Sequence, residues 1–189
     1  MNKTGKISTK TITLAAILTS LVVILQIVSN VSGTFLPVVI TLTLIPVVIG
    51  AAKCHPMVGG WLGFVAGLTI LFSGAASSFF VVSPLGTIVT VLLKGTASGI
   101  AAGYVYKLIE KKNKTVAIFA ASITAPIVNT GIFFLGCLLF FMGLVSEWAG
   151  GENVALYMFT GLAGVNFLVE LALNVILAPT VKRLIEIKN

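Results

Sequence analysis

Hydrophobic residues occupy long stretches of this chain, and polar residues gather in the short segments between them. A helix needs about 20 apolar residues to cross the hydrocarbon core of a bilayer. The pattern therefore predicts an all-α, polytopic membrane protein with six transmembrane helices. We expect these helices at about 11–29, 36–52, 56–72, 84–107, 115–145 and 155–178.

Prolines and glycines mark where the expected helices depart from a regular course. The second stretch is broken by Pro37 and Pro46, and a basic tail begins at Pro179 after the sixth. The fifth stretch is long enough to be tilted, or bent near Pro126 and Gly131.

The composition excludes a soluble globular protein. Of 189 residues, 58% are hydrophobic and 9% are charged, whereas soluble domains have roughly 45–50% apolar and about 25% charged residues. Six spans leave no room for a second, water-exposed domain. We therefore expect residues 1–189 to form a single membrane domain.

The charged residues predict the orientation of the helices. The net charge is +7, which can indicate a nucleic-acid partner, but here the cations flank apolar stretches. Eleven of the twelve cations lie in the N-terminal segment, two connections and the tail: Lys3, Lys6, Lys10, Lys53, Lys107, Lys111, Lys112, Lys114, Lys182, Arg183 and Lys188. The connections 30–35, 73–83 and 146–154 have none. The positive-inside rule then places both termini in the cytoplasm of a multi-pass cell-membrane protein, with no nucleic-acid partner.

Several polar residues fall inside the expected spans. Lys94 is the twelfth cation and lies about ten residues into the fourth helix, near mid-membrane. An ionisable group there is costly unless it is paired or hydrated, so it is a candidate functional residue. In the sixth helix Asn166 and Asn174 lie one turn before and after Glu170, on one face.

Three further polar side chains extend this set: Asn129 midway along the fifth helix, and Gln26 and Asn30 near the outer end of the first. We expect the group to converge on one cavity. An internal ion pair between Lys94 and Glu170 is an alternative, and a ligand could still insert between the two.

The connections 73–83 and 146–154 combine small residues with aromatic ones. This composition suits loops that fold over a binding site, and it equally suits disordered loops. Phe79, Phe80 and Trp61 could stack against a ring in a ligand, although rings at such positions also serve core or lipid contacts.

Most enzyme classes lack their required residues here. Metal-dependent phosphotransferases need clustered carboxylates, and the chain has no Asp and one mid-membrane Glu. The only histidine, His55, lies in a tight connection away from mid-membrane, which argues against a Ser–His pair. No phosphate-binding loop ending in Lys-Ser/Thr is present. We expect no catalytic residues, no metal and no cofactor. A proton-coupled carrier could use Glu170 as its relay, but the chain is too short for the usual inverted repeats.

Small residues recur at four-residue spacing in three of the expected helices. Such faces allow close helix packing, and we expect this of the glycines on the third and fourth helices: Gly59, Gly63, Gly67, Gly95, Gly99 and Gly103. On the first helix, Ala15 with Thr19 and Ala16 with Ser20 form a ladder near the cytoplasmic face. That ladder could face lipid and dock another membrane protein.

Three stretches resemble a known family of membrane proteins. Leu42–Ala51 (LTLIPVVIGA), with Pro56 and Gly59–Gly60 after it, resembles the second and third helices of the substrate-binding S-components of energy-coupling-factor (ECF) vitamin transporters. Lys94-Gly95 with Ala101–Tyr104 (AAGY) resembles their fourth helix, where an Arg often stands at the Lys94 position. Ala125–Gly131 (APIVNTG) resembles the fifth.

The resemblance implies a high-affinity subunit that captures a water-soluble vitamin from outside. It also implies a transmembrane coupling subunit and two cytosolic ATPases as partners. S-components commonly dock through Ala-x-x-x-Ala on the first helix, where this chain has Ala15-x-x-x-Thr19 or Ala16-x-x-x-Ser20.

The fifth-helix run is most like that of pantothenate-type members. A carboxylate ligand would also suit Lys94, because a charge-assisted bond is strong in a dry pocket. Glu170 argues mildly against this, because it can itself neutralise Lys94. The expected substrate-binding residues are Lys94, Asn129, Asn166, Glu170, Phe79, Phe80 and Gln26. Riboflavin or another vitamin, a stand-alone small-solute carrier and a non-transporting scaffold are the alternatives.

Overall fold

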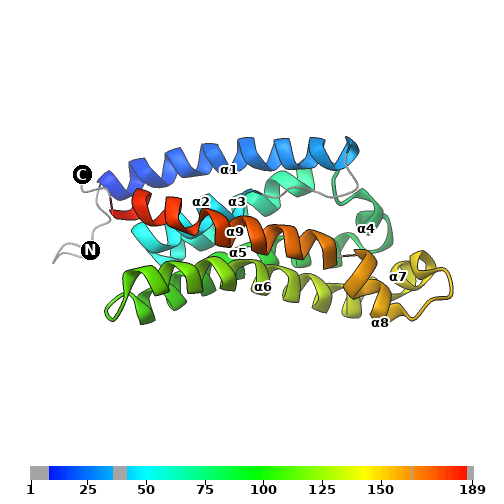
Figure 1. Cartoon of the computed structure of the whole chain (residues 1–189). Helices are drawn as coiled ribbons and strands as arrows, with labels where there is room; N and C mark the ends of the chain where they lie inside the picture. The colour runs from blue at the N-terminus through cyan, green and yellow to red at the C-terminus, as the bar shows by residue number, and fades with distance from the viewer. Residues whose placement is uncertain (1–8, 36–41, 163, 187–189) are drawn as a thin grey trace.

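The computed structural model describes residues 9–35, 42–162 and 164–186, and every regular element within those ranges is helical (Figure 1). The long helices are α1 (Thr9–Phe35), α3 (Pro56–Phe72), α5 (Pro84–Ile109), α6 (Lys114–Phe140) and α9 (Gly164–Glu186). The short elements are α2 (Leu44–Lys53), α4 (Ser77–Val82), α7 (Met142–Ala149), α8 (Val154–Tyr157) and a π-helical turn η1 (Met158–Leu162). The all-α prediction is confirmed for the part of the chain that the structure describes.

Two of the expected helices begin or end elsewhere because of their local sequence. Helix α1 continues to Phe35, through the segment expected to connect it to the second helix. Helix α2 begins only at Leu44, and Pro46 lies in its first turn instead of breaking it. A proline is favoured there, because the first N–H groups of a helix have no intrahelical acceptor. Pro37 and the rest of 36–41 lie outside the described residues.

The expected fifth helix, 115–145, is divided at Phe141. This residue leaves the helical conformation (φ −128°, ψ 14°), and α7 follows it. Its side chain is almost completely buried. The break therefore turns the chain while keeping the ring in the core, which hydrophobic spacing alone did not reveal.

The expected sixth helix, 155–178, is divided into α8, η1 and α9, and α9 continues past Pro179 to Glu186. Gly164 is the first residue of α9, and a Cβ at this position would collide with the carbonyl oxygen of Phe159. Membrane helices tolerate an internal proline such as Pro179, because local adjustments satisfy the freed carbonyl.

Four of the described helices are long and apolar enough to cross a membrane: Thr9–Val31, Pro84–Ile109, Lys114–Phe140 and Gly164–Glu186. Helices α2 and α3 are apolar but shorter, about 15 and 25 Å at 1.5 Å per residue. Large apolar side chains such as Ile17, Leu139 and Ile176 point out of the bundle. An outward-facing apolar surface of this kind is suited to lipid and not to water.

Helices α3 and α5 pack backbone to backbone, and glycines make this possible. A Cβ on Gly63 would meet the carbonyl of Gly95, and a Cβ on Gly99 would meet that of Gly59. The predicted packing role of these glycines is confirmed. Helix α5 also packs along α6, and α9 closes the bundle against α6 and α2.

The two ends of the bundle differ in charge. The start of α1, the end of α2, the α5–α6 turn and the end of α9 lie at one end, and α4, α7 and α8 lie at the other (Figure 1). All the described flanking cations are therefore at the first end, which we call the cationic end. Lys3, Lys6 and Lys188 lie outside the described residues.

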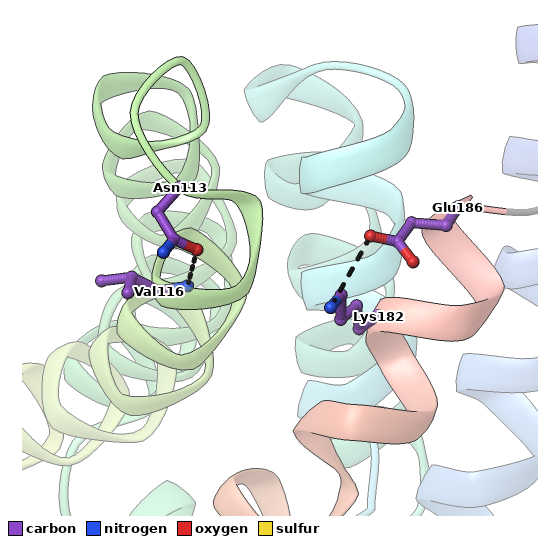
Figure 2. A network of polar contacts seen from close by, with 4 residues as sticks. All are labelled: Asn113, Val116, Lys182 and Glu186. Carbon is purple, nitrogen blue, oxygen red and sulfur yellow. Dashed lines mark hydrogen bonds and ion pairs between the residues drawn. The ribbon is translucent and has the colours of Figure 1, made fainter.

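Polar contacts fix the helix termini at the cationic end. Asn113 caps α6 by accepting a hydrogen bond from the Val116 N–H (3.1 Å), and Lys182 pairs with Glu186 (4.0 Å) on α9 (Figure 2). Lys53 at the end of α2 donates to the Leu184 carbonyl (2.9 Å), which ties α2 to the last turn of α9.

Candidate functional site

A cavity of about 440 Å³ lies among α1, α2, α3, α5, α6 and α9, and its lining residues belong to the halves of these helices away from the cationic end. A volume of this size suits a small organic molecule. Its walls combine polar side chains with small residues from the α3–α5 contact, such as Gly63 and Gly95.

Five of the residues expected to bind substrate line this single cavity: Gln26, Lys94, Asn129, Asn166 and Glu170. They come from four helices that are far apart in the sequence. In each helix they lie in the half nearer α4, α7 and α8, so the antiparallel packing brings them to one depth. Their contact with a ligand stays a prediction.

The structure does not bring Phe79 and Phe80 to the cavity. The Phe79 ring is packed against the rings of Phe133, Phe141 and Trp148, behind the cavity wall. Phe80 is the next residue of α4, so it points in a different direction and is exposed. Trp61 faces outward as well, and its indole N–H donates to the Thr19 hydroxyl on α1 (3.2 Å).

Lys94 is the cation of the cavity. Its ammonium lies 5.2 Å from the centroid of the Phe133 ring, a cation–π distance. The carboxyl group of Glu170 and the thiol of Cys137 are near enough to interact with it electrostatically. Lys94 therefore has an aromatic ring and an acidic group as neighbours.

A chain of hydrogen bonds fixes the orientation of two amides at the α1 side of the cavity. The Ser73 hydroxyl donates to the Ile70 carbonyl (2.9 Å), so its oxygen accepts from Asn30 Nδ2 (2.7 Å). Asn30 Oδ1 then accepts from Gln26 Nε2 (2.9 Å), and Gln26 Oε1 accepts from the Thr43 hydroxyl (3.2 Å). Counting only the bonds between described residues, each amide has one further N–H and one further lone pair.

The sequence pattern did not single out several residues of the wall. Thr43 and Thr130 lie inside apolar stretches, where a lone threonine commonly bonds its own helix. Phe133 is one of a pair of rings in an apolar helix, and nothing in its spacing separates it from a lipid-facing phenylalanine. Asn174, expected on the face of Glu170, is buried and donates to the Glu170 backbone carbonyl (2.8 Å), so it stabilises α9.

The small-residue ladder of α1 is partly exposed on the surface of the bundle. Ala16 and Ser20 are exposed, whereas Ala15 and Thr19 are partly buried. The hydroxyls of Thr19 and Ser20 donate to the carbonyls of Ala15 and Ala16 within the helix (2.7 and 3.3 Å). With their donors satisfied, these side chains behave as small, nearly apolar groups that allow another helix to approach closely.

In the described ranges, no group of three or more His, Cys, Asp or Glu side chains is placed to hold a metal ion. Cys54 and Cys137 are free thiols, the first near the cationic end and the second buried. The site consists of an ammonium, several amides, a carboxyl group and apolar walls. These groups can bind and orient a small polar molecule.

The apolar surface and the long apolar helices indicate an integral membrane protein, and its cavity is large enough for a small molecule. The family model "ECF transporter, substrate-specific component" matches residues 10–182, and the chain belongs to this family. Its members are substrate-binding subunits, not enzymes, and work with a membrane coupling subunit and ATPases. No curated protein and no solved structure matches the chain.

Proposed function

We propose that this protein captures a water-soluble vitamin, with pantothenate favoured, outside the cell membrane for an ATP-driven ECF transporter. The observation that carries the proposal is the Lys94 ammonium on the wall of the 440 Å³ cavity. Among the vitamins, pantothenate combines a carboxylate with hydroxyl groups and an amide. The carboxylate would pair with Lys94, and Gln26, Asn129 and Asn166 would bond the hydroxyl and amide groups.

The charge distribution supports an orientation with the cationic end in the cytoplasm. Six crossings then include α2 and α3 as short spans, both termini are cytoplasmic, and the whole chain forms one membrane domain. In this orientation the cavity lies in the outer half of the bilayer. The connections 73–83 and 146–154, with α4 and α7, lie over its outer side.

Transport requires partners, because the sequence contains no phosphate-binding loop of the Lys-Ser/Thr type. The coupling subunit would reorient the loaded protein when the two ATPases hydrolyse ATP. The exposed pair Ala16 and Ser20 on α1 supports docking to that subunit, since small residues permit close helix–helix contact.

The test is to identify the molecule that the purified protein carries. Denaturing the protein should release pantothenate, which mass spectrometry identifies. Calorimetry with pantothenate and with riboflavin should show binding of pantothenate only. Binding of riboflavin alone would assign a different vitamin. Pantothenate uptake into proteoliposomes should need the coupling subunit and ATPases, and uptake by the chain alone would show a stand-alone carrier.

A further inference from the structure

Aromatic rings connect the candidate anion contact to the outer end of the molecule. The Phe133 ring lines the cavity and lies 5.2 Å from the Lys94 ammonium. On its other side the Phe79 ring of α4 meets it edge-to-face, with 5.8 Å between the centroids. Phe133 is therefore the one ring that touches both the cavity's cation and the packed rings behind the wall, among the ring contacts of the described residues.

Phe79 is the centre of this cluster. Besides Phe133 it contacts Phe141 at the break between α6 and α7 (5.0 Å) and Trp148 in α7 (5.5 Å), each edge-to-face. Residue Phe79 belongs to the connection 73–83, and Trp148 belongs to the connection 146–154. Both connections of the outer end thus meet at one ring, one contact away from Phe133.

We propose that Phe133 is a positioning residue that holds the Lys94 ammonium before a ligand binds and transmits the release of the ammonium. An incoming anionic group would draw the ammonium away from the ring, because a charge-assisted hydrogen bond to a carboxylate is stronger than a cation–π contact. The Phe133 ring then readjusts against Phe79, and Phe79 readjusts against Trp148. Occupancy of the cavity is in this way transmitted to both outer connections. The inference rests on the proposed capture of an anionic ligand at Lys94.

Trp148 makes the inference measurable. The chain has two tryptophans, and Trp61 lies on α3 outside the cluster, so Trp61→Phe leaves Trp148 as the single reporter. In that background Lys94→Met removes the ammonium without any ligand and should shift the Trp148 emission. Lys112→Met, at the cationic end, is the matched control and should leave the emission unchanged.

The pathway is tested by removing its middle ring. In Phe133→Leu the Lys94→Met substitution should no longer shift the emission, and Phe133→Tyr, which restores a ring, should recover the shift. If Phe133→Leu fails to fold, Phe133→Met serves instead. A shift that persists in Phe133→Leu would overturn the proposal. A shift that Glu170→Gln abolishes and Phe133→Leu does not would also overturn it, because the Glu170 carboxylate would then hold the ammonium.

Titration with pantothenate separates this inference from the proposed function. The vitamin should shift the emission in the same direction as Lys94→Met, because both take the ammonium from the ring. A ligand-free shift without a pantothenate response would support the ring contact and contradict the choice of vitamin. Pantothenate binding without any shift in either experiment would support the function and overturn the transmission through Phe133.

Discussion

Gly63 in α3 and Gly95 in α5 touch backbone to backbone, directly beside Lys94. A Cβ on either glycine would collide with the carbonyl oxygen of the other. Lys94 precedes Gly95 in α5, and both residues line the cavity. The closest contact between α3 and α5 therefore lies next to the residue that carries the charge of the cavity.

Gly63→Ala should destabilise the fold, because α3 and α5 must move apart to admit the methyl group. Overpacking of this kind costs about 1–3 kcal/mol, which a lower thermal midpoint in detergent would show. Gly131→Ala in α6 is the matched control, since a Cβ there meets nothing within 4 Å. Equal losses in the two variants would contradict the close contact.

Lys94→Gln should weaken pantothenate binding at least tenfold, which corresponds to about 1.4 kcal/mol. The substitution removes the charge that we expect to pair with the carboxylate while keeping a polar side chain. Isothermal titration calorimetry measures the change, and Lys112→Gln in the exposed α5–α6 turn should bind as the wild type does. Unchanged affinity in a folded Lys94→Gln protein would refute the assignment.

The contact between Asn30 and Ser73 should be measurable as a coupling energy. Asn30 Nδ2 donates to the Ser73 oxygen (2.7 Å), which joins α1 to the connection 73–83. Hydrogen bonds contribute about 0.5–1.5 kcal/mol net, so a double-mutant cycle of Asn30→Ala and Ser73→Ala should be non-additive by an amount in this range.

Ser78→Ala in the same connection provides the control for that cycle, because Ser78 is exposed. Combined with Asn30→Ala, it should give an additive effect on the thermal midpoint. Additivity in both cycles would mean that the Asn30–Ser73 bond does not stabilise the protein.

His55 should make stability sensitive to acid. Its Nδ1 caps α3 by accepting from the Met57 N–H (3.2 Å). Two causes lower the pKa of His55 below its ordinary value of 6.5: burial is the larger, and repulsion from Lys107 is the next. As the pH falls, His55 is therefore protonated at a higher pH in the unfolded chain than in the folded protein. The contribution of His55 is complete above the unfolded pKa and is lost as the pH falls through the lower, folded pKa.

The measurement is the thermal midpoint between about pH 8 and about pH 5, a range that spans the ordinary histidine pKa. The wild type should lose more stability on acidification than His55→Ser, because serine caps a helix without titrating. The same pH dependence in both proteins would rule out His55 as the source.

Larger side chains on the exposed side of the α1 ladder should prevent assembly with the coupling subunit. Ala16→Leu with Ser20→Leu keeps the surface apolar but removes the close approach that small residues allow. Co-purification with the coupling subunit should be lost while pantothenate binding is retained. Ala172→Leu, on the exposed face of α9, should assemble normally, and loss of assembly in that variant too would contradict a specific α1 surface.

The sequence by itself determined the helical class, the placement of charge and most of the polar residues that line the cavity. Long apolar stretches allow few alternatives to membrane helices, and a lone Lys94 or Glu170 stands out because charge inside a membrane is costly. Antiparallel packing of the helices then brings Gln26, Asn129 and Asn166 to the same cavity.

Only the tertiary structure decided which neutral residues complete the site. Thr43 and Phe133 have nothing unusual in their local spacing, and they join the cavity wall because other helices bring Gln26 and Lys94 against them. The break at Phe141 also depends on long-range packing, since hydrophobicity continues across it. Hydropathy reports how each residue partitions between water and an apolar phase. The contacts between helices depend on shape, which emerges only when the helices pack together.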